Sequence, residues 1–200
     1  MSVLEIIGVI VSALAIWLTA RRKMLCWPVG LISVALYGWI FFDAKLYSDM
    51  LLQAAFAILQ VYGWWVWLAQ KRRNTQTVDS GEVRVQAVAL KALVTGLLLA
   101  VVGSVVLGSL MARLTDAALP YVDASLTAFS LVAQYWTARR YIASWWLWVV
   151  VDVVYVGMFV FKGLYATSGL YALFVALAVI GLRDWSRAAT LKPAKTPRAA

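Results

Sequence analysis

A long internal duplication constrains the fold of this chain more than any other feature of its sequence. The segment Ser12–Trp67 recurs without a gap 118 residues later as Ser130–Trp185, with eighteen identities in fifty-six aligned positions. Two segments this similar are expected to adopt the same local structure, so the chain should fold as two related halves. The period is far longer than the roughly 20–50 residues of a solenoid repeat, and it is typical of the internal repeats of membrane proteins.

The composition places this duplication in a membrane. Hydrophobic residues make up 64% of the chain and charged residues only 14%, far outside the balance of a soluble domain. A backbone in lipid must satisfy its own hydrogen bonds, and the alternating strands of a barrel are absent from the pattern, so we expect an all-α integral membrane protein. Seven apolar stretches have about the length that crosses a bilayer. They are Val3–Ala20, Leu25–Phe42, Met50–Ala69, Ala87–Leu110, Val122–Thr137, Ser144–Phe161 and Ser168–Leu182.

Each copy contains three of these spans, and the fourth lies between the copies without a counterpart. Because three is odd, a direct fusion would invert the second half, and one extra helix restores its direction. We therefore expect a 3+1+3 arrangement with two parallel three-helix repeats. The expected units are 1–69 as the first repeat, 70–110 as a cytoplasmic loop and linker helix, 111–186 as the second repeat, and 187–200 as a disordered cytoplasmic tail.

The basic residues predict the orientation of the chain. Of eighteen Lys and Arg residues, fifteen fall on one side of the predicted spans and three, Lys45, Arg113 and Lys162, fall on the other. This bias predicts an N-terminus outside the cell membrane and a C-terminus in the cytoplasm. The net charge of +9 then reflects topology and attraction to anionic membrane lipid. A nucleic-acid partner is not expected, because the basic residues are divided among four short segments.

The composition also excludes several kinds of chemistry. The chain has one cysteine, Cys26, and no histidine, so a disulfide framework, a Cys/His metal site and His-based catalysis are all excluded. We expect no metal and no cofactor. An intramembrane enzyme would need paired acids or a nucleophile with its base, and the sequence supplies neither.

Asp152 is the most informative polar residue, because it falls near the middle of the sixth span. An ionised carboxylate at that depth is costly and needs a cavity or a partner. No Lys or Arg lies at a comparable depth, which indicates that the cation arrives as a ligand. The alternative is a protonated carboxyl that donates a hydrogen bond between helices. A purely structural or receptor-like subunit would leave this residue unexplained.

Aromatic residues share a helical face with this acid, at spacings of three and four. The stripe comprises Trp145, Trp148, Asp152, Tyr155 and Phe159. Aromatic faces attract cations, so the stripe suits a flat, positively charged ring. Trp145 aligns with Trp27 of the other copy, and it is either an interfacial anchor or a ligand contact.

The third span adds two polar positions on one face. Gln53 and Gln60 are seven residues apart and align with Tyr171 and Ala178. They either contact a ligand or tie helices together. Trp148 likewise aligns with Gly30 and Asp152 with Val34, so the mismatches between the copies mark an asymmetric site. The equivalent glycines Gly63 and Gly181 are expected to be helix-packing positions.

The same residues carry a family resemblance. The segments Gly30–Trp67, Thr137–Ala166 and Gly181–Trp185 are similar to those of the PnuC family of bacterial vitamin transporters, and the resemblance covers nearly the whole chain. It implies a fold related to the SWEET sugar transporters and a homotrimer in the bacterial inner membrane. It also implies facilitated diffusion of nicotinamide riboside, which a cytoplasmic vitamin kinase traps by phosphorylation.

The resemblance also implies a set of substrate-binding residues. The family pattern W-x-x-W-x-x-x-N falls on Trp145, Trp148 and position 152, where this chain has Asp in place of the usual Asn. The family also contains carriers of thiamine, another flat cation, so nicotinamide riboside is the expected substrate and thiamine the alternative. The expected substrate-binding residues are Trp145, Trp148, Asp152, Tyr155, Gln53 and Gln60.

Overall fold

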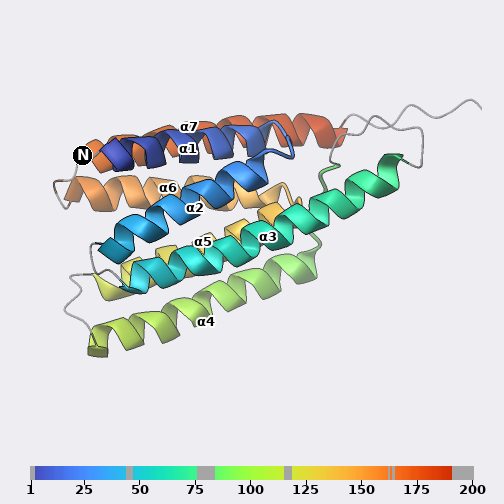
Figure 1. Cartoon of the computed structure of the whole chain (residues 1–200). Helices are drawn as coiled ribbons and strands as arrows, with labels where there is room; N and C mark the ends of the chain where they lie inside the picture. The colour runs from blue at the N-terminus through green and yellow to red at the C-terminus, as the bar shows by residue number, and fades with distance from the viewer. Residues whose placement is uncertain are drawn as a thin grey trace, which may run out of the picture.

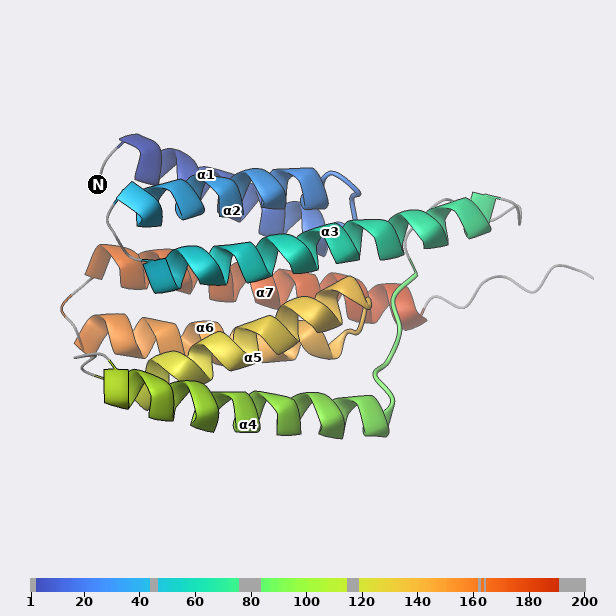
Figure 2. The same ribbon diagram turned by 60° about the horizontal axis from the view of Figure 1, so that its bottom comes forward.

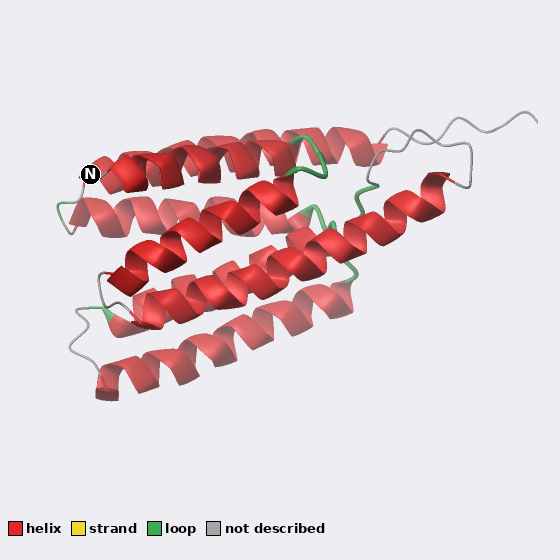
Figure 3. Cartoon of the chain, viewed as in Figure 1, coloured by secondary structure: helices red, strands yellow, loops and turns green. Residues whose placement is uncertain are grey.

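The described part of the computed structural model is a bundle of seven α-helices without a strand (Figures 1 and 3). It comprises residues 3–43, 47–75, 84–114, 119–161, 163 and 165–190. The helices are α1 (Val3–Ala20), α2 (Cys26–Asp43), α3 (Tyr47–Thr75), α4 (Leu90–Leu114), α5 (Pro120–Ala138), α6 (Ala143–Phe161) and α7 (Tyr165–Thr190). The prediction of an all-α protein with seven helices is therefore confirmed.

Several helices extend beyond the predicted spans, α3 and α7 the farthest, and α4 is shifted to Leu90–Leu114 from the predicted Ala87–Leu110. The helix α3 continues to Thr75 and α7 continues to Thr190, because helical structure does not stop where the apolar stretch does. The first residues of the predicted loop 70–86 and of the predicted tail 187–200 are consequently helical. Residues 84–89 are described and are not helical, whereas residues 76–83 and 191–200, on which the remainder of those predictions falls, lie outside the described residues.

Six of the described helices are long and apolar enough to cross a membrane. The exception is α5, which was predicted as the fifth span. It contacts α3, α4 and α6, and several of its polar side chains line the interior of the bundle. The lower hydropathy of α5 is therefore explained by the polar side chains that it directs into the bundle.

Six helices form a closed ring through their contacts, in the order α1, α2, α3, α5, α6 and α7, with α7 returning to α1. The remaining described helix, α4, packs on α5 outside this ring, along the lower edge of the bundle in Figure 2. In both views α1 and α5 run in the same direction, as do α3 and α7 (Figures 1 and 2). The axis that relates the two halves stays a prediction.

Small residues hold α4 against α5. The buried residues of α4 recur every fourth position and are Gly96, Ala100, Ser104 and Gly108. A methyl group added at Gly96 would come within 2.6 Å of the Trp136 ring, so the glycine permits the close approach of the two helices. Large apolar side chains such as Leu98 and Leu99 are exposed, as expected for a surface that faces lipid.

The repeated Thr-Ala-Arg-Arg sequence forms the same turn in both halves. Arg22 and Arg140 adopt φ values of 56° and 65°, the left-handed conformation that commonly ends a helix. The backbone N–H of Arg22 donates to the Thr19 carbonyl at 2.9 Å, and that of Arg140 donates to the Thr137 carbonyl at 2.9 Å. The repeated sequence therefore ends a helix in the same way in both halves.

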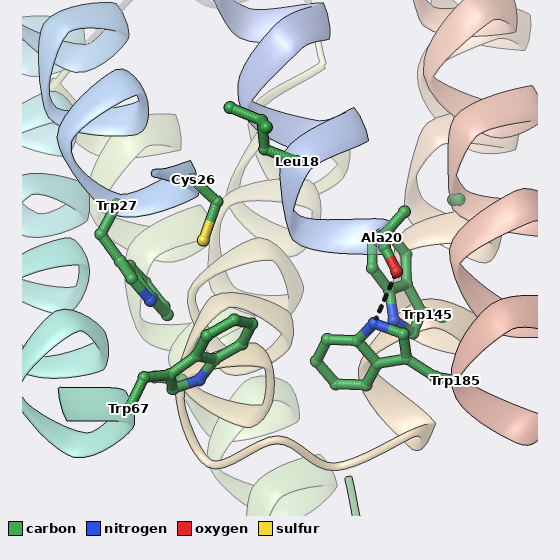
Figure 4. Packing of buried hydrophobic residues seen from close by; sticks show 9 residues of the cluster. Leu18, Ala20, Cys26, Trp27, Trp67, Trp145 and Trp185 are labelled. Atoms are coloured by element: carbon green, nitrogen blue, oxygen red, sulfur yellow. Dashed lines mark hydrogen bonds between the residues drawn. The ribbon is translucent and has the colours of Figure 1, made fainter. Parts of the chain in front are cut away.

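A cluster of four tryptophans lies beside these turns (Figure 4). The rings of Trp27 and Trp67 meet edge to face with centroids 5.2 Å apart, and those of Trp145 and Trp185 do so at 5.4 Å. Trp67 and Trp185 join the two pairs at 6.1 Å. All four are at most 2% exposed, so the two halves share one aromatic core.

Glycines make room for this cluster. A methyl group on Gly63 would overlap the Trp27 ring, and one on Gly181 would lie 2.6 Å from the Trp145 ring. The prediction that both are helix-packing positions is confirmed.

The cluster is not fully symmetric. The indole N–H of Trp185 is 3.2 Å from the carbonyl oxygens of both Thr19 and Ala20, at the end of α1. The equivalent indole N–H of Trp67 is buried without a hydrogen-bond partner in the described part of the chain. The contact between α1 and α7, here called the α1–α7 seam, therefore contains a hydrogen-bonded tie from this tryptophan. The equivalent tryptophan makes no such bond in the α3–α5 seam.

Candidate substrate-binding cavity

A cavity of about 660 Å³ lies inside the ring of helices. All six helices of the ring contribute side chains to its wall, and α4 contributes Met111. The predicted site residues Gln53, Gln60, Trp145, Trp148, Asp152 and Tyr155 all line it. The cavity has the size of many small-molecule sites.

Asp152 lies in the wall of this cavity and is 6% exposed. It occupies the middle of α6, as far as possible from both helix ends. Among the described residues, no Lys or Arg forms an ion pair with it. A cation in the cavity would supply the missing countercharge.

Aromatic rings of α6 and α7 form one wall of the cavity. This wall lies at a distance from the tryptophan cluster. The ring of Tyr171 lies 4.5 Å from that of Tyr155, 5.2 Å from Phe159 and 5.5 Å from Phe174, between centroids. All four side chains line the cavity. The predicted stripe on α6 therefore faces one space, and Tyr171, which the copy alignment paired with Gln53, completes an aromatic wall.

The two tryptophans of the stripe differ in their surroundings. Trp145 is 2% exposed, with its ring against Gly181 and Trp185, so most of its surface serves packing. Trp148 is less buried, and its indole N–H donates to the Thr137 hydroxyl at 3.2 Å. Its ring orientation is thus set from α5.

The two glutamines enter the cavity from α3. A methyl group on Gly30 would be 2.5 Å from Nε2 of Gln60, so the Gln60 side chain occupies the space left by this glycine on α2. In the second half Trp148 and Ala178 occupy the equivalent positions, and Trp148 packs against the cluster that contains Ala178. In the first half a small residue on α2 faces a large one on α3. In the second half the sizes are exchanged, with the large residue on α6 and the small one on α7.

The sequence analysis missed a polar face of α5. Five of its side chains line the cavity, namely Asp123, Thr127, Ser130, Gln134 and Thr137. Their spacings of four, three, four and three residues place them on one face of a helix. This periodicity was present in the sequence, as was the mismatch of Gln134 with Ile16. Within the described residues no cluster of His, Cys, Asp and Glu could hold a metal ion.

Known proteins resemble this chain over most of its length. The sequence profile of the nicotinamide mononucleotide transporter family matches residues 2–187. The nicotinamide riboside transporter PnuC of Escherichia coli (strain K12) is 30% identical over 208 residues, covering 94% of this chain and 87% of that transporter. The riboflavin/roseoflavin transporter RibM of Streptomyces davaonensis is 30% identical over 184 residues, covering 90% of this chain and 83% of its own length.

A solved structure has the same fold. The crystal structure of the vitamin B3 transporter PnuC matches with a TM-score of 0.71 at 24% sequence identity, covering 93% of this chain and 81% of that one. The resemblance noted from the sequence segments is confirmed. Since the profile and the riboside transporter each match nearly the whole chain, the chain belongs to the PnuC family of membrane transporters.

Proposed function

We propose that this protein carries nicotinamide riboside across the bacterial inner membrane by facilitated diffusion. The observation that carries the proposal is Asp152, a buried carboxylate without a basic partner among the described residues, in a cavity with an aromatic wall. Nicotinamide riboside carries a flat, positively charged nicotinamide ring, and aromatic faces with a carboxylate complement such a ring. The names of the relatives from E. coli and the vitamin B3 structure support this substrate.

Thiamine is the second candidate, because it also carries a flat, positively charged ring. Riboflavin, named for the Streptomyces relative, is uncharged and would leave Asp152 unpaired. A titration of the purified protein with each of the three vitamins, followed by thermal unfolding, ranks them, since a ligand that binds the folded form stabilises it by mass action. The largest shift is expected for nicotinamide riboside.

The remaining parts of the proposal concern the setting of the carrier. The protein would return its ligand unchanged, a cytoplasmic kinase would trap the vitamin by phosphorylation, and the carrier would assemble as a homotrimer. The excess of basic residues on one side supports a periplasmic N-terminus and a cytoplasmic C-terminus.

Transport by reconstituted protein tests the role of Asp152. In liposomes the wild-type protein should move labelled nicotinamide riboside down its gradient, and Asp152→Ala should reduce the rate to that of empty liposomes. Val150→Ala, on the same helix but on an exposed position, should transport like wild type. Undiminished transport by Asp152→Ala would remove the central residue from the proposal.

A further inference from the structure

The polar face of α5 has no role in the site described so far. Thr127, Ser130 and Gln134 line the cavity, and none of their side chains makes a hydrogen bond within the described part of the chain. Thr137, by contrast, donates to the Ala133 carbonyl and accepts from Trp148. Three groups that can donate and accept are thus available to a ligand.

Burial makes this availability significant. Ser130 is only 4% exposed, but its hydroxyl stays accessible from the cavity that the residue lines, so water or a ligand there supplies its partner. In the other half the equivalent Ser12 is satisfied, since its hydroxyl lies 2.6 Å from that of Ser33 and donates to the Gly8 carbonyl. Both serines line the cavity, but within the described part of the chain only the hydroxyl of Ser130 makes no hydrogen bond to the protein.

The position of this face relative to Asp152 follows from the turn between α5 and α6. Ser130 lies ten residues before Arg140, and Asp152 lies ten residues after Ile142. Because both helices rise about 1.5 Å per residue, the hydroxyl and the carboxylate lie at similar depth on neighbouring helices. Gln134 lies one turn nearer to the tryptophan cluster, and Thr127 lies about one turn farther away.

We propose that Thr127, Ser130 and Gln134 form a subsite for the hydroxyl-rich substituent of the cationic ring held at Asp152. A pentose offers neighbouring hydroxyl groups that both donate and accept, which is what two hydroxyls and one carboxamide recognise. The first half cannot form this subsite, because its equivalent residues are Val9, Ser12 and Ile16. The inference rests on the proposed function and extends it, since it selects a glycosylated cation over a bare one.

Competition between two ligands that share one ring tests the subsite. Calorimetric titration of the purified protein would use nicotinamide riboside and 1-methylnicotinamide, in which a methyl group replaces the sugar. Wild type should prefer the riboside by at least about tenfold, a factor that corresponds to about 1.4 kcal/mol. Ser130→Ala with Gln134→Leu should abolish the preference and leave the affinity for 1-methylnicotinamide unchanged. That retained affinity also shows that the variant is folded.

The matched control is Ser125→Ala, which removes a hydroxyl from α5 outside the cavity wall and should keep the preference. The subsite is refuted if the double variant still prefers the riboside, if both ligands weaken equally, or if wild type shows no preference. Wild type that binds neither ligand would overturn the proposed function as well, so the two failures are distinguishable.

Discussion

Gln60 reaches the cavity because its neighbour on α2 has no side chain. The space over Gly30 is filled by the Gln60 carboxamide, the far end of a flexible side chain. A change at Gly30 can therefore displace the amide without disturbing the packing of the helices. The tryptophan rings over Gly63 and Gly181 are rigid and buried, and the same change there would strain the core.

Gly30→Ala should lower the affinity for nicotinamide riboside by about tenfold, the equivalent of one lost hydrogen bond of about 1.4 kcal/mol. The added methyl group excludes the Gln60 amide from its present position. Thermal stability should change little, because the side chain can move. Calorimetric titration and thermal unfolding of the same preparation measure both quantities.

Gly157→Ala is the control, since a methyl group there would meet nothing within 4 Å. It should bind like wild type. Equal affinities of Gly30→Ala and wild type would contradict the role of Gln60.

Residue patterns predicted part of the cavity wall and missed the rest for identifiable reasons. Asp152 stood out because an acid in an apolar span has few alternatives, and the structure places it in the cavity wall. Sequence spacing alone left Trp145 undecided between anchor and contact, and only its packing on Gly181 and Trp185 shows how little of it faces the cavity. Ser130 was hidden because it is identical to Ser12, so a search for mismatches passed over it.

At the scale of helices, the two seams between the halves are chemically unequal. Trp185 of α7 ties the end of α1 through two carbonyl oxygens, whereas Trp67 of α3 makes no such bond to α5 in the described structure. Both indoles are fully buried in the same cluster. Trp67 and Trp185 are therefore equivalent positions that differ mainly in whether the indole N–H makes a hydrogen bond.

Trp185→Phe should destabilise the protein more than Trp67→Phe, by about 1 kcal/mol, the net value of a typical hydrogen bond. Both variants leave a similar cavity, so the difference between them isolates the tie. Thermal unfolding in detergent should show a midpoint about 2–4 °C lower for Trp185→Phe than for Trp67→Phe. Equal midpoints would mean that the bond contributes nothing to stability.

The number and type of the helices were predictable, since about twenty apolar residues leave a membrane segment little choice but a helix. Their ends were less so. Hydropathy predicts which residues lie in the lipid, and it does not predict where a helix ends. The helices α3 and α7 continue beyond their apolar stretches. The polar α5 shows the converse, because a span that faces a cavity falls below the apolar content of one that faces lipid.

At the scale of the whole molecule, the ring encloses few groups that could carry protons. Asp152 and Asp123 both line the cavity, but Asp123 lies in the first turn of α5, seven residues from Ser130 and hence about 10 Å farther along the helix. Histidine is absent from the chain. A cation that pairs directly with Asp152 needs no accompanying proton.

An imposed pH gradient should therefore not drive accumulation of nicotinamide riboside in proteoliposomes. With the membrane potential held at zero by potassium and valinomycin, the internal concentration should rise to the external value and stop there, with the inside either more acidic or more alkaline than the outside. Scintillation counting of the trapped vitamin over time measures this limit. Accumulation above the external concentration in either gradient would show that proton movement is coupled to transport.

The ring also bears on how such a chain could arise. Its two seams, α1 with α7 and α3 with α5, are made by equivalent helices of the two copies, so each is the other with the partners exchanged. That is the property of a two-fold dimer, in which one patch pairs with itself. A single three-helix unit with these two faces would close such a ring with a second copy of itself. The outer helix α4 contacts only α5 among the described helices. It would then serve to connect the two units in one polypeptide with both running in the same direction.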